Sequence, residues 1–204
     1  MKILVWNARG LDSNRAFQVL LRLKQTYKPD LIFLIETKSD HYRMEIIKVK
    51  LGFPNKLVVN NIGRSRGLCL MWSNLADVSP ISYSQFHIDV QIVSHRNVCW
   101  RWTSFYGNPD VNERQHRWTL LRGLSRMSNL PWVCAGDFTE ILNENEKVGG
   151  VCRTKGRIER FRETLDECGL QDLGFMGPSF TWCDKRDREE MIQERLDRCV
   201  VTLE

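Results

Sequence analysis

Residues 132–137 read WVCAGD, an apolar run that ends on a glycine and a carboxylate. The four residues from Trp132 to Ala135 predict a buried β-strand, because a short apolar run bounded by a turn residue is typical of a strand covered on both faces. Gly136 and Asp137 follow directly. The strand is therefore expected to present a carboxylate at the rim of its sheet.

Two further apolar runs end in the same way. Ile3 to Trp6 is followed by Asn7, and Leu31 to Ile35 is followed by Glu36. Strand ends that share one rim bring hard oxygen ligands together, and Mg²⁺ prefers such ligands. The pattern predicts a metal or phosphate site. The alternative, that each polar residue only begins a loop, stays open.

Helices and strands alternate around a central block of strands. The predicted helices are Ala16 to Tyr27, Asp40 to Leu51, Asn108 to about Met127, and Arg157 to Cys168. Asn108 is the expected N-cap of the third helix, with Pro109 at its first position. The central strands are Lys56 to Asn60, Gly67 to Trp72, Val78 to Tyr83, Phe86 to Val93, and Val98 to Tyr106. A closing hairpin is expected from Phe180 to Cys183 and from Gln193 to Val201. The pattern favours an α+β fold in which two packed β-sheets carry helices on the outside.

The composition narrows the class of protein. The 204 residues are 42% hydrophobic and 27% charged, as in an ordinary globular domain, and they contain no repeat or linker. No apolar run approaches the roughly 20 residues of a membrane helix, and the first residues do not form a signal peptide. We therefore expect one domain that is intracellular, nuclear or cytoplasmic, and not secreted. Seven cysteines without a C-x-x-C spacing do not support a zinc motif, and the net charge of +5 leans mildly toward polyanionic partners.

A series of short motifs runs along the chain in a fixed order. They are Trp6-Asn7-Ala8-Arg9-Gly10-Leu11, Ile35-Glu36-Thr37-Lys38, Gly63-Arg64-Ser65-Arg66-Gly67-Leu68, Tyr106-Gly107-Asn108, Gly136-Asp137-Phe138-Thr139-Glu140-Ile141-Leu142, Glu146-Lys147-Val148-Gly149-Gly150, Phe180-Thr181-Trp182 and Glu194-Arg195-Leu196-Asp197-Arg198. In this order they resemble the endonuclease/exonuclease/phosphatase superfamily. The resemblance is greatest to the endonuclease domain of plant long-interspersed-element (non-LTR) retrotransposons.

The resemblance implies a four-layer α/β/β/α sandwich over residues 1–204, as a single domain. The family has a final Ser-Asp-His segment that finds no counterpart after Asp197, so the resemblance implies a C-terminally truncated domain that lacks its last segment. Ser39-Asp40-His41 spells the same tripeptide but stands at a helix start. We interpret Asp40 as a helix cap, and none of the four histidines is assigned to catalysis.

The family's site residues map onto this sequence one by one. By resemblance, Asn7, Glu36 and Asp197 are the metal-site residues, with Mg²⁺ or Mn²⁺ as the implied cofactor. The implied catalytic residues are Asp137, which orients or deprotonates water, and Tyr106, Thr139 and Asn7. The candidates for DNA binding are Arg9, Arg64, Arg66 and Asn108. Thr139 departs from the family, which has Asn there. Thr offers one hydroxyl on a short arm, whereas Asn offers two amide donors on a longer one.

The resemblance implies a metal-dependent endonuclease that hydrolyses phosphodiester bonds in DNA. Because of Thr139 and the missing segment, its activity is expected to be impaired. Two alternatives stay open: an inactive remnant that binds metal or nucleic acid without turnover, and a phosphatase or phosphodiesterase of the same superfamily. The expected partner is DNA, with no membrane. A fused reverse transcriptase domain is normal for such proteins and absent here, and we expect a monomer.

Overall fold

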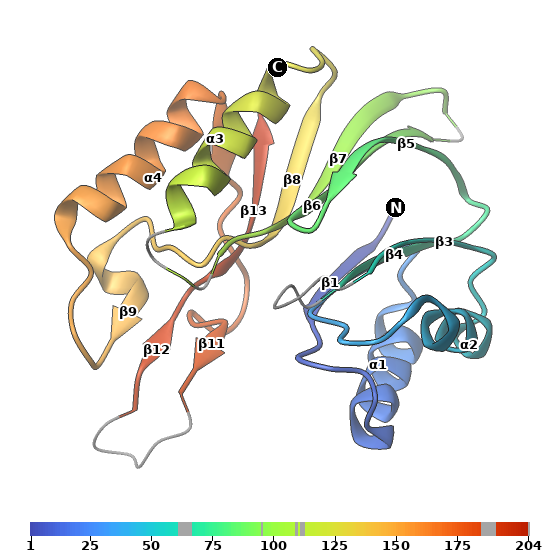
Figure 1. Ribbon diagram of the computed structural model, residues 1–204. Helices are drawn as coiled ribbons and strands as arrows, with labels where there is room; N and C mark the ends of the chain where they lie inside the picture. The colour runs from blue at the N-terminus through green and yellow to red at the C-terminus, as the bar shows by residue number, and fades with distance from the viewer. Residues whose placement is uncertain (61–66, 95, 109, 111–112, 185–190, 204) are drawn as a thin grey trace. The chain divides into compact units, whose positions relative to one another are not determined.

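The computed structural model describes residues 1–60, 67–94, 96–108, 110, 113–184 and 191–203 (Figure 1). By its internal contacts the chain divides into two compact units, Met1–Ser104 and Phe105–Glu204. The chain passes from one to the other within strand β7 (Cys99–Tyr106). The expectation of a single domain over residues 1–204 stays a prediction.

The first unit is built on a four-stranded mixed sheet with the order β1-β2-β4-β3. Its strands are β1 (Ile3–Asn7), β2 (Leu31–Ile35), β3 (Asn55–Val59) and β4 (Leu68–Trp72). β1 and β2 are parallel, and the other two pairs are antiparallel. Every residue of β2 is buried, as the uninterrupted apolar run predicts for a strand that is covered on both faces.

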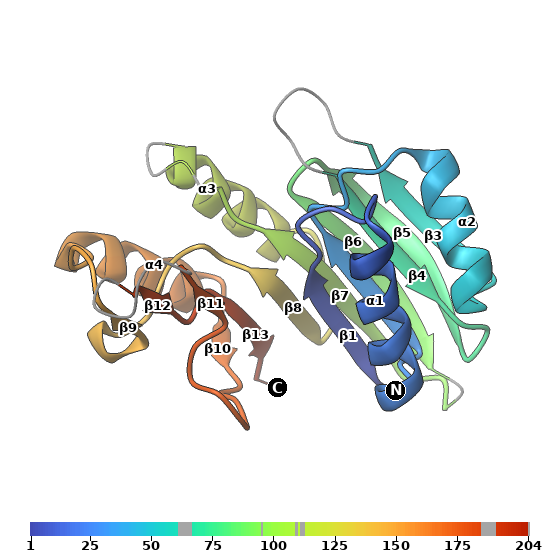
Figure 2. The same ribbon diagram turned by 90° about the horizontal axis from the view of Figure 1, so that it is seen from below.

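Two helices cover one face of this sheet, α1 (Asn14–Tyr27) and α2 (His41–Leu51) (Figure 2). Ile32 and Leu34 point toward them and share a core with Leu20 and Met44. Asp40 caps α2, because its Oδ1 accepts a hydrogen bond of 2.7 Å from the backbone N–H of Arg43. This contact agrees with the interpretation of Asp40 as a helix cap.

The opposite face of the sheet carries the strands β5 (Ala76–Ser84) and β6 (His87–Ser94), which pair as an antiparallel hairpin and are followed by β7. A buried ion pair joins β6 to β7. Arg101 and Asp89 are both fully buried, and the Arg101 Nε and Asp89 Oδ1 atoms lie 2.9 Å apart. Thr103 donates a further hydrogen bond of 2.7 Å to Asp89 Oδ1. The buried Asp89 carboxylate on β6 therefore depends on hydrogen-bond donors from β7, and the two strands are held together by this pairing.

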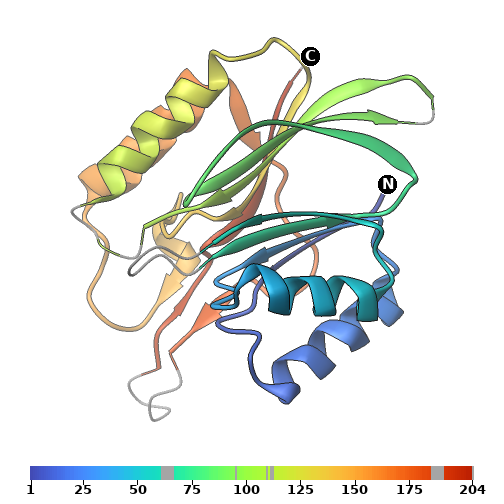
Figure 3. The ribbon, with the colours of Figure 1, turned by 45° about the vertical axis from the view of Figure 1, so that its right-hand side comes forward.

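The second unit places two helices, α3 (Arg114–Ser125) and α4 (Lys155–Glu167), side by side on one face of a sheet (Figure 3). The strands of this part, in order, are β10 (Leu170–Asp172), β13 (Asp197–Thr202), β8 (Trp132–Asp137) and the end of β7. A smaller sheet joins β11 (Trp182–Cys183), β12 (Gln193–Glu194) and β9 (Lys147–Val148), and a 3-10 turn, η2 (Glu144–Glu146), precedes β9. The core is aromatic: Trp118 stacks on Phe161, and Phe138 stacks on Phe105.

The predicted α+β class, with two sheets flanked by helices, is confirmed. The closing hairpin is confirmed in part, since β11 and β12 pair but β13 leaves them to join β8 and β10. The predicted start of the third helix at Asn108 is wrong. The Asn108 side chain accepts a 2.9 Å hydrogen bond from the backbone N–H of Asp110 in a local turn, and the helix begins only at Arg114. Pro109 lies outside the described residues.

No helix among the described residues is long and apolar enough to cross a membrane.

Gly136 is the position at which a side chain would do most damage. Its backbone has φ +152°, and an added Cβ would lie 1.8 Å from the carbonyl oxygen of Phe105. We expect Gly136→Ala to lower the free energy of unfolding by about 3 kcal/mol or more, because two backbones must separate. Urea denaturation followed by circular dichroism measures the change.

Gly123 provides the control for Gly136. It lies inside α3, and a Cβ added there would meet nothing within 4 Å. Gly123→Ala is expected to stabilise the protein by about 0.5–1 kcal/mol through helix propensity. Equal unfolding free energies for the two alanine variants would contradict the backbone contact.

Candidate active site

The ends of β1 and β2 bring Asn7 and Glu36 to one rim of the first unit. The two strands are parallel with Asn7 opposite Ile35, so Glu36 is the next residue beyond that pair. The ladder then continues into the two loops, where the N–H groups of Ala8 and Gly10 donate to the carbonyls of Ile35 and Glu36 at 2.9 and 2.8 Å. The rim that the sequence predicts is therefore present for this pair of strands.

The two loops at this rim are held in left-handed backbone conformations. Arg9, Glu36 and Lys38 have φ of +51°, +54° and +51°. Residues other than glycine rarely adopt this region, and each such residue costs on the order of 1 kcal/mol. Surrounding hydrogen bonds hold the strained residues in place, among them the Thr37 N–H to the carbonyl of Gly67 at 3.2 Å. Strain of this kind concentrates at functional sites.

The side chains at this rim offer oxygen atoms in a confined setting. Glu36 is only 5% exposed, and Asn7 Oδ1 accepts a 3.3 Å hydrogen bond from the backbone of Arg9. The neighbouring Thr37 hydroxyl is buried and has no hydrogen-bond partner among the described residues, which is unusual for a buried polar atom. One carboxylate, one amide and a polar neighbour fit a divalent cation that keeps several of its waters. No cluster of three or more His, Cys, Asp or Glu side chains suited to a metal occurs among the described residues.

In the second unit, two carboxylates stand opposite each other across an antiparallel strand pair. β13 pairs with β8 in a register that sets Asp197 directly across from Asp137. Directly opposed residues project from the same face of the sheet, with Cβ atoms about 5 Å apart. Two carboxylates on the same face at this separation can hold a cation between them.

The loop after β8 fixes the Asp137 carboxylate. Its Oδ1 accepts a 2.9 Å hydrogen bond from the backbone N–H of Thr139, whose φ is +57°. The Thr139 hydroxyl donates to the carbonyl oxygen of Asn108 at 3.1 Å, and the N–H of Gly107 donates to the carbonyl of Asp137. Tyr106, at the end of β7, is 4% exposed. The loops that follow β7 and β8 are thus tied together at one end of the sheet.

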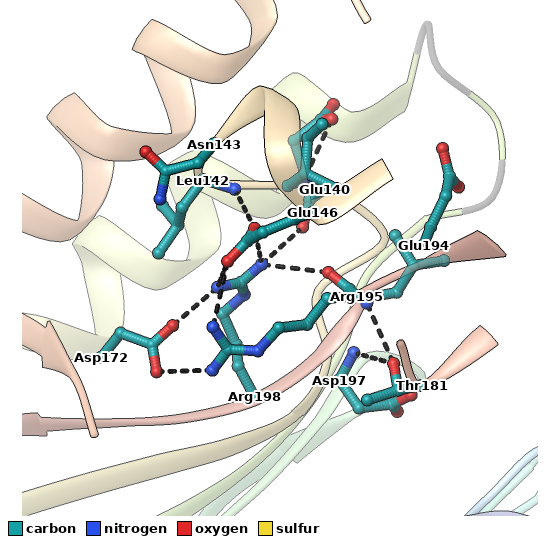
Figure 4. Close-up of polar contacts among 12 residues, drawn as sticks. Glu140, Leu142, Asn143, Glu146, Asp172, Thr181, Glu194, Arg195, Asp197 and Arg198 are labelled. Atoms are coloured by element: carbon teal, nitrogen blue, oxygen red, sulfur yellow. Dashed lines mark hydrogen bonds and ion pairs between the residues drawn. The ribbon is translucent and has the colours of Figure 1, made fainter. Parts of the chain in front are cut away.

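Thr181 fixes the backbone at Asp197 (Figure 4). Its hydroxyl oxygen accepts hydrogen bonds from the N–H groups of Leu196 and Asp197, at 3.0 and 2.9 Å. Phe138 is tied to the same corner, since its N–H donates to the Leu196 carbonyl at 2.9 Å. The backbone at the start of β13 is therefore fixed both by Thr181 and by the residue that follows β8.

Arg195, Arg198, Glu146 and Asp172 form a largely buried square of charges beside β13 (Figure 4). Arg198 donates to Glu146 Oε2 at 2.8 Å and to Asp172 Oδ2 at 2.7 Å. Arg195 donates to the other oxygens of the same two carboxylates, both at 3.0 Å. Asp197 and Arg198 are successive residues of β13, and successive residues of a strand point to opposite faces. The network around Arg198 therefore holds the face of β13 opposite to Asp197.

Neighbouring basic side chains set the ionisation of two buried carboxyls, Glu146 and Glu194. Burial by itself raises the pKa of the Glu146 carboxyl. The hydrogen bond and charge of Arg198, with the N–H of Leu142, outweigh burial and hold that pKa below its ordinary value. Glu194 shows the same balance, in which Arg153 and Lys147 outweigh burial and lower the pKa. Both carboxylates therefore stabilise the folded chain in their charged form.

The structure brings the predicted site residues together in two sets, each within its own unit. The first set is Asn7, Arg9 and Glu36, and the second is Tyr106, Asn108, Asp137, Thr139 and Asp197. Arg64 and Arg66 lie outside the described residues. The sequence interpretation missed the positioning roles of Thr181 and Arg198, although both stand in motifs that it singled out, Phe180-Thr181-Trp182 and Glu194 to Arg198.

Comparison with known proteins identifies the family of the chain. The sequence profile of the Endonuclease/Exonuclease/phosphatase family matches residues 4–201. The chain belongs to this family. No curated protein sequence matches it significantly. The predicted superfamily is thereby confirmed.

Solved structures of this family share the fold. The endonuclease domain of TRAS1, a telomere-specific non-LTR retrotransposon, is 18% identical with a TM-score of 0.71, over 98% of this chain and 84% of that one. A 3′ phosphatase from Neisseria is 17% identical with a TM-score of 0.73, over 99% and 86%. An AP endonuclease from Leishmania major is 15% identical with a TM-score of 0.73, over 98% and 78%. At these identities the likeness shows the fold.

Substitutions of Thr139 test whether its hydroxyl stabilises the loop through the hydrogen bond to Asn108. Thr139→Val keeps the branched shape but loses the hydroxyl that donates to Asn108, so we expect the free energy of unfolding to fall by about 1 kcal/mol. Thr139→Ser keeps the hydroxyl and removes the branch from a left-handed residue, and it is expected to stay within about 0.5 kcal/mol of the parent. Urea denaturation separates the two, and a serine variant as unstable as the valine variant would contradict the role of the hydroxyl.

The lowered pKa values of Glu146 and Glu194 predict that the folded protein loses stability in acid. A carboxyl with a lowered folded pKa contributes stability that is complete above its unfolded pKa of about 4.3 and is lost as the pH falls through the lower folded value. We expect the urea midpoint to hold from pH 7 to about 5 and to decline below that. Glu146→Gln should lower stability at pH 7 by about 3 kcal/mol and flatten this decline. The exposed Glu163→Gln is the control, and an unchanged acid profile in Glu146→Gln would refute the assignment.

Proposed function

We propose that the protein is a divalent-metal-dependent phosphodiesterase that cuts DNA, of the kind found in non-LTR retrotransposons. The observation that carries the proposal is the opposed pair Asp137 and Asp197 on β8 and β13, beside the loop that holds Asn108. Family membership supports hydrolysis of a phosphate ester in general. The retrotransposon source rests on the ordered motifs and on the fold shared with the TRAS1 domain.

Each residue has a role that its setting supports. Asp137, oriented through its Oδ1 by the Thr139 N–H, holds the attacking water and accepts its proton. The Tyr106 hydroxyl and the Asn108 amide donate hydrogen bonds to the phosphate oxygens, which carry more charge in the transition state. Arg9 is exposed and holds the DNA backbone, since guanidinium matches phosphate geometry. Binding is then electrostatic and weakens as salt rises.

Asn7, Glu36 and Asp197 are the residues that would hold Mg²⁺ or Mn²⁺. When bound, the ion supplies charge neutralisation at the phosphate and at the leaving oxygen. By resemblance to the family, residues of both units serve the same reaction. That assignment can be tested, because residues that act as one catalytic group show strongly non-additive effects.

The setting of Thr139 supports a low rate of DNA hydrolysis. Its hydroxyl is committed to the Asn108 carbonyl and its side chain is 5% exposed, so it offers no donor to a substrate. Asn tolerates the left-handed backbone of this position better than Thr does. The family residue therefore fits here and adds an amide donor. A chain that binds DNA or metal without turnover is the competing function.

Nicking of supercoiled plasmid tests the proposal. With Mg²⁺ the protein should nick slowly, and Asp137→Asn and Glu36→Gln should each lower the rate by about 10²–10⁴-fold. The double variant should be hardly slower than the worse single one, because a site that lacks one essential group has little left to lose. Thr139→Asn should raise the rate by about tenfold or more.

The controls separate catalysis from folding. Circular dichroism must show intact Asp137→Asn and Glu36→Gln proteins, and Arg22→Gln, an exposed change on α1, should nick like the parent. Binding of a labelled duplex, followed by fluorescence anisotropy, is expected to survive in Asp137→Asn. Nicking that is independent of Asp137, or binding of DNA with no nicking even by Thr139→Asn, would reject the nuclease in favour of contamination or of the binding function.

A further inference from the structure

The second unit contains a basic cavity that no role described above explains. The cavity has a volume of about 330 Å³ and lies between the start of α3 and the start of α4. Its lining includes Arg114, Trp118, Glu140, Thr154, Arg157 and Arg160. A water molecule occupies about 30 Å³ of liquid, so the cavity has room for a phosphate group with its hydration.

Positive charge in this cavity exceeds negative charge. Arg114 and Arg157 both donate to the same oxygen, Glu140 Oε2, at 3.0 and 3.1 Å. Arg160 lines the cavity as well, with its Nε on the carbonyl of Gly156, and Glu140 is the acidic member of the lining. Three guanidinium groups against one carboxylate leave a charge of +2 (3 − 1). An uncompensated charge of this size in a concave site attracts an anion.

Burial increases that attraction. Arg114 is only 8% exposed, and Glu140 is 2% exposed. Burial lowers the pKa of the Arg114 guanidinium, although the charge of Glu140 partly opposes this. An anion entering the cavity would replace the solvation that Arg114 has lost. The wall of the cavity therefore includes a buried guanidinium that has lost solvation and that an anion would stabilise.

The first turn of α4 adds donors at the mouth of the cavity. Thr154 is the N-cap of this 13-residue helix, yet its side chain makes no capping hydrogen bond, and the first turn contains no acidic residue. The start of a helix carries a partial positive charge and unpaired N–H groups. Because Thr154 lines the cavity, this end of α4 adds to the positive potential there.

The remaining wall restricts the kind of ligand. The Trp118 ring stacks on Phe161 with centroids 4.7 Å apart and is itself 4% exposed, so its face is already covered. It cannot stack on a nucleobase. The cavity thus selects a compact anion through arginine and N–H donors.

We propose that this cavity binds a phosphate group, in the form of a phosphate monoester or free inorganic phosphate. The site is separate from the proposed hydrolysis, and its occupancy does not depend on that activity. Arg114 links the two places, because its Nε donates to the Asn108 carbonyl at 2.9 Å while its NH1 holds Glu140. A phosphate in the cavity would therefore stabilise the loop that carries Asn108.

Titration of inorganic phosphate tests the site. The readout is the melting temperature, and chloride keeps the ionic strength constant so that general screening does not change. Phosphate should raise the melting temperature of the parent in the millimolar range, and Arg160→Gln should weaken the apparent affinity by about tenfold, as expected for one charge-assisted hydrogen bond. Arg22→Gln, an exposed change of equal charge on α1, should bind like the parent.

A pair of variants at Thr154 separates binding from stability. Thr154→Asp should cap α4 and raise the melting temperature without phosphate, yet it should abolish the phosphate-dependent rise, because it puts a negative charge at the cavity mouth. Thr154→Asn should cap the helix and keep the rise. The proposal is overturned if phosphate does not raise the melting temperature of the parent. It is also overturned if phosphate raises the melting temperatures of Arg160→Gln and Thr154→Asp as much as that of the parent.

Oligonucleotides identify the source of the phosphate. A tetranucleotide with a 5′-phosphate is compared with the same tetranucleotide bearing a 5′-hydroxyl, in the parent and in Arg160→Gln. Stronger stabilisation by the phosphorylated strand, lost in Arg160→Gln, assigns the cavity to a strand end. Equal effects of the two strands, together with an Arg160-dependent effect of inorganic phosphate, assign it to the free anion.

Discussion

The antiparallel pairing of β8 with β13 is the constraint on which the second unit depends. Its register places Asp137 opposite Asp197 and Gly136 opposite Arg198. Gly136 can then let the backbone of β7 approach, since a Cβ there would fall 1.8 Å from the Phe105 carbonyl. A shift of β13 by one residue would turn the Asp197 carboxylate to the other face of the sheet and leave Asp137 without it. The candidate site thus exists only in this register.

Burying charged side chains costs desolvation energy, but the paired geometry of four side chains fixes the register of β13. Arg195 and Arg198 share Glu146 and Asp172, and each carboxylate oxygen of the square has a guanidinium partner. Breaking one member leaves the others uncompensated, which costs about 3–5 kcal/mol for a buried pair. An apolar core would tolerate sliding of β13, whereas paired donors and acceptors permit one position.

The first unit achieves a fixed site by a different route. Its functional residues follow parallel strands, so the site is built from loops that continue the ladder between β1 and β2. Left-handed backbone at Arg9, Glu36 and Lys38 stores strain that the ladder and the contact with Gly67 hold in place. In the first unit, backbone hydrogen bonds fix the site residues, whereas in the second unit ion pairs between side chains fix β13.

The sequence by itself determined the local features: the buried strands, the helix cap at Asp40, and the polar residues Asn7, Glu36 and Asp137 that follow three strands. These depend on neighbours within a few residues, and hydrophobic period and capping chemistry report them. Only the tertiary structure decided that Asp197 faces Asp137, that Thr181 fixes its backbone and that α3 begins at Arg114. Asp137 and Asp197 are 60 positions apart, and no local propensity encodes the register between strands so distant. That register is set by which side chains pack and pair when the strands meet, and so it appears only in the folded chain.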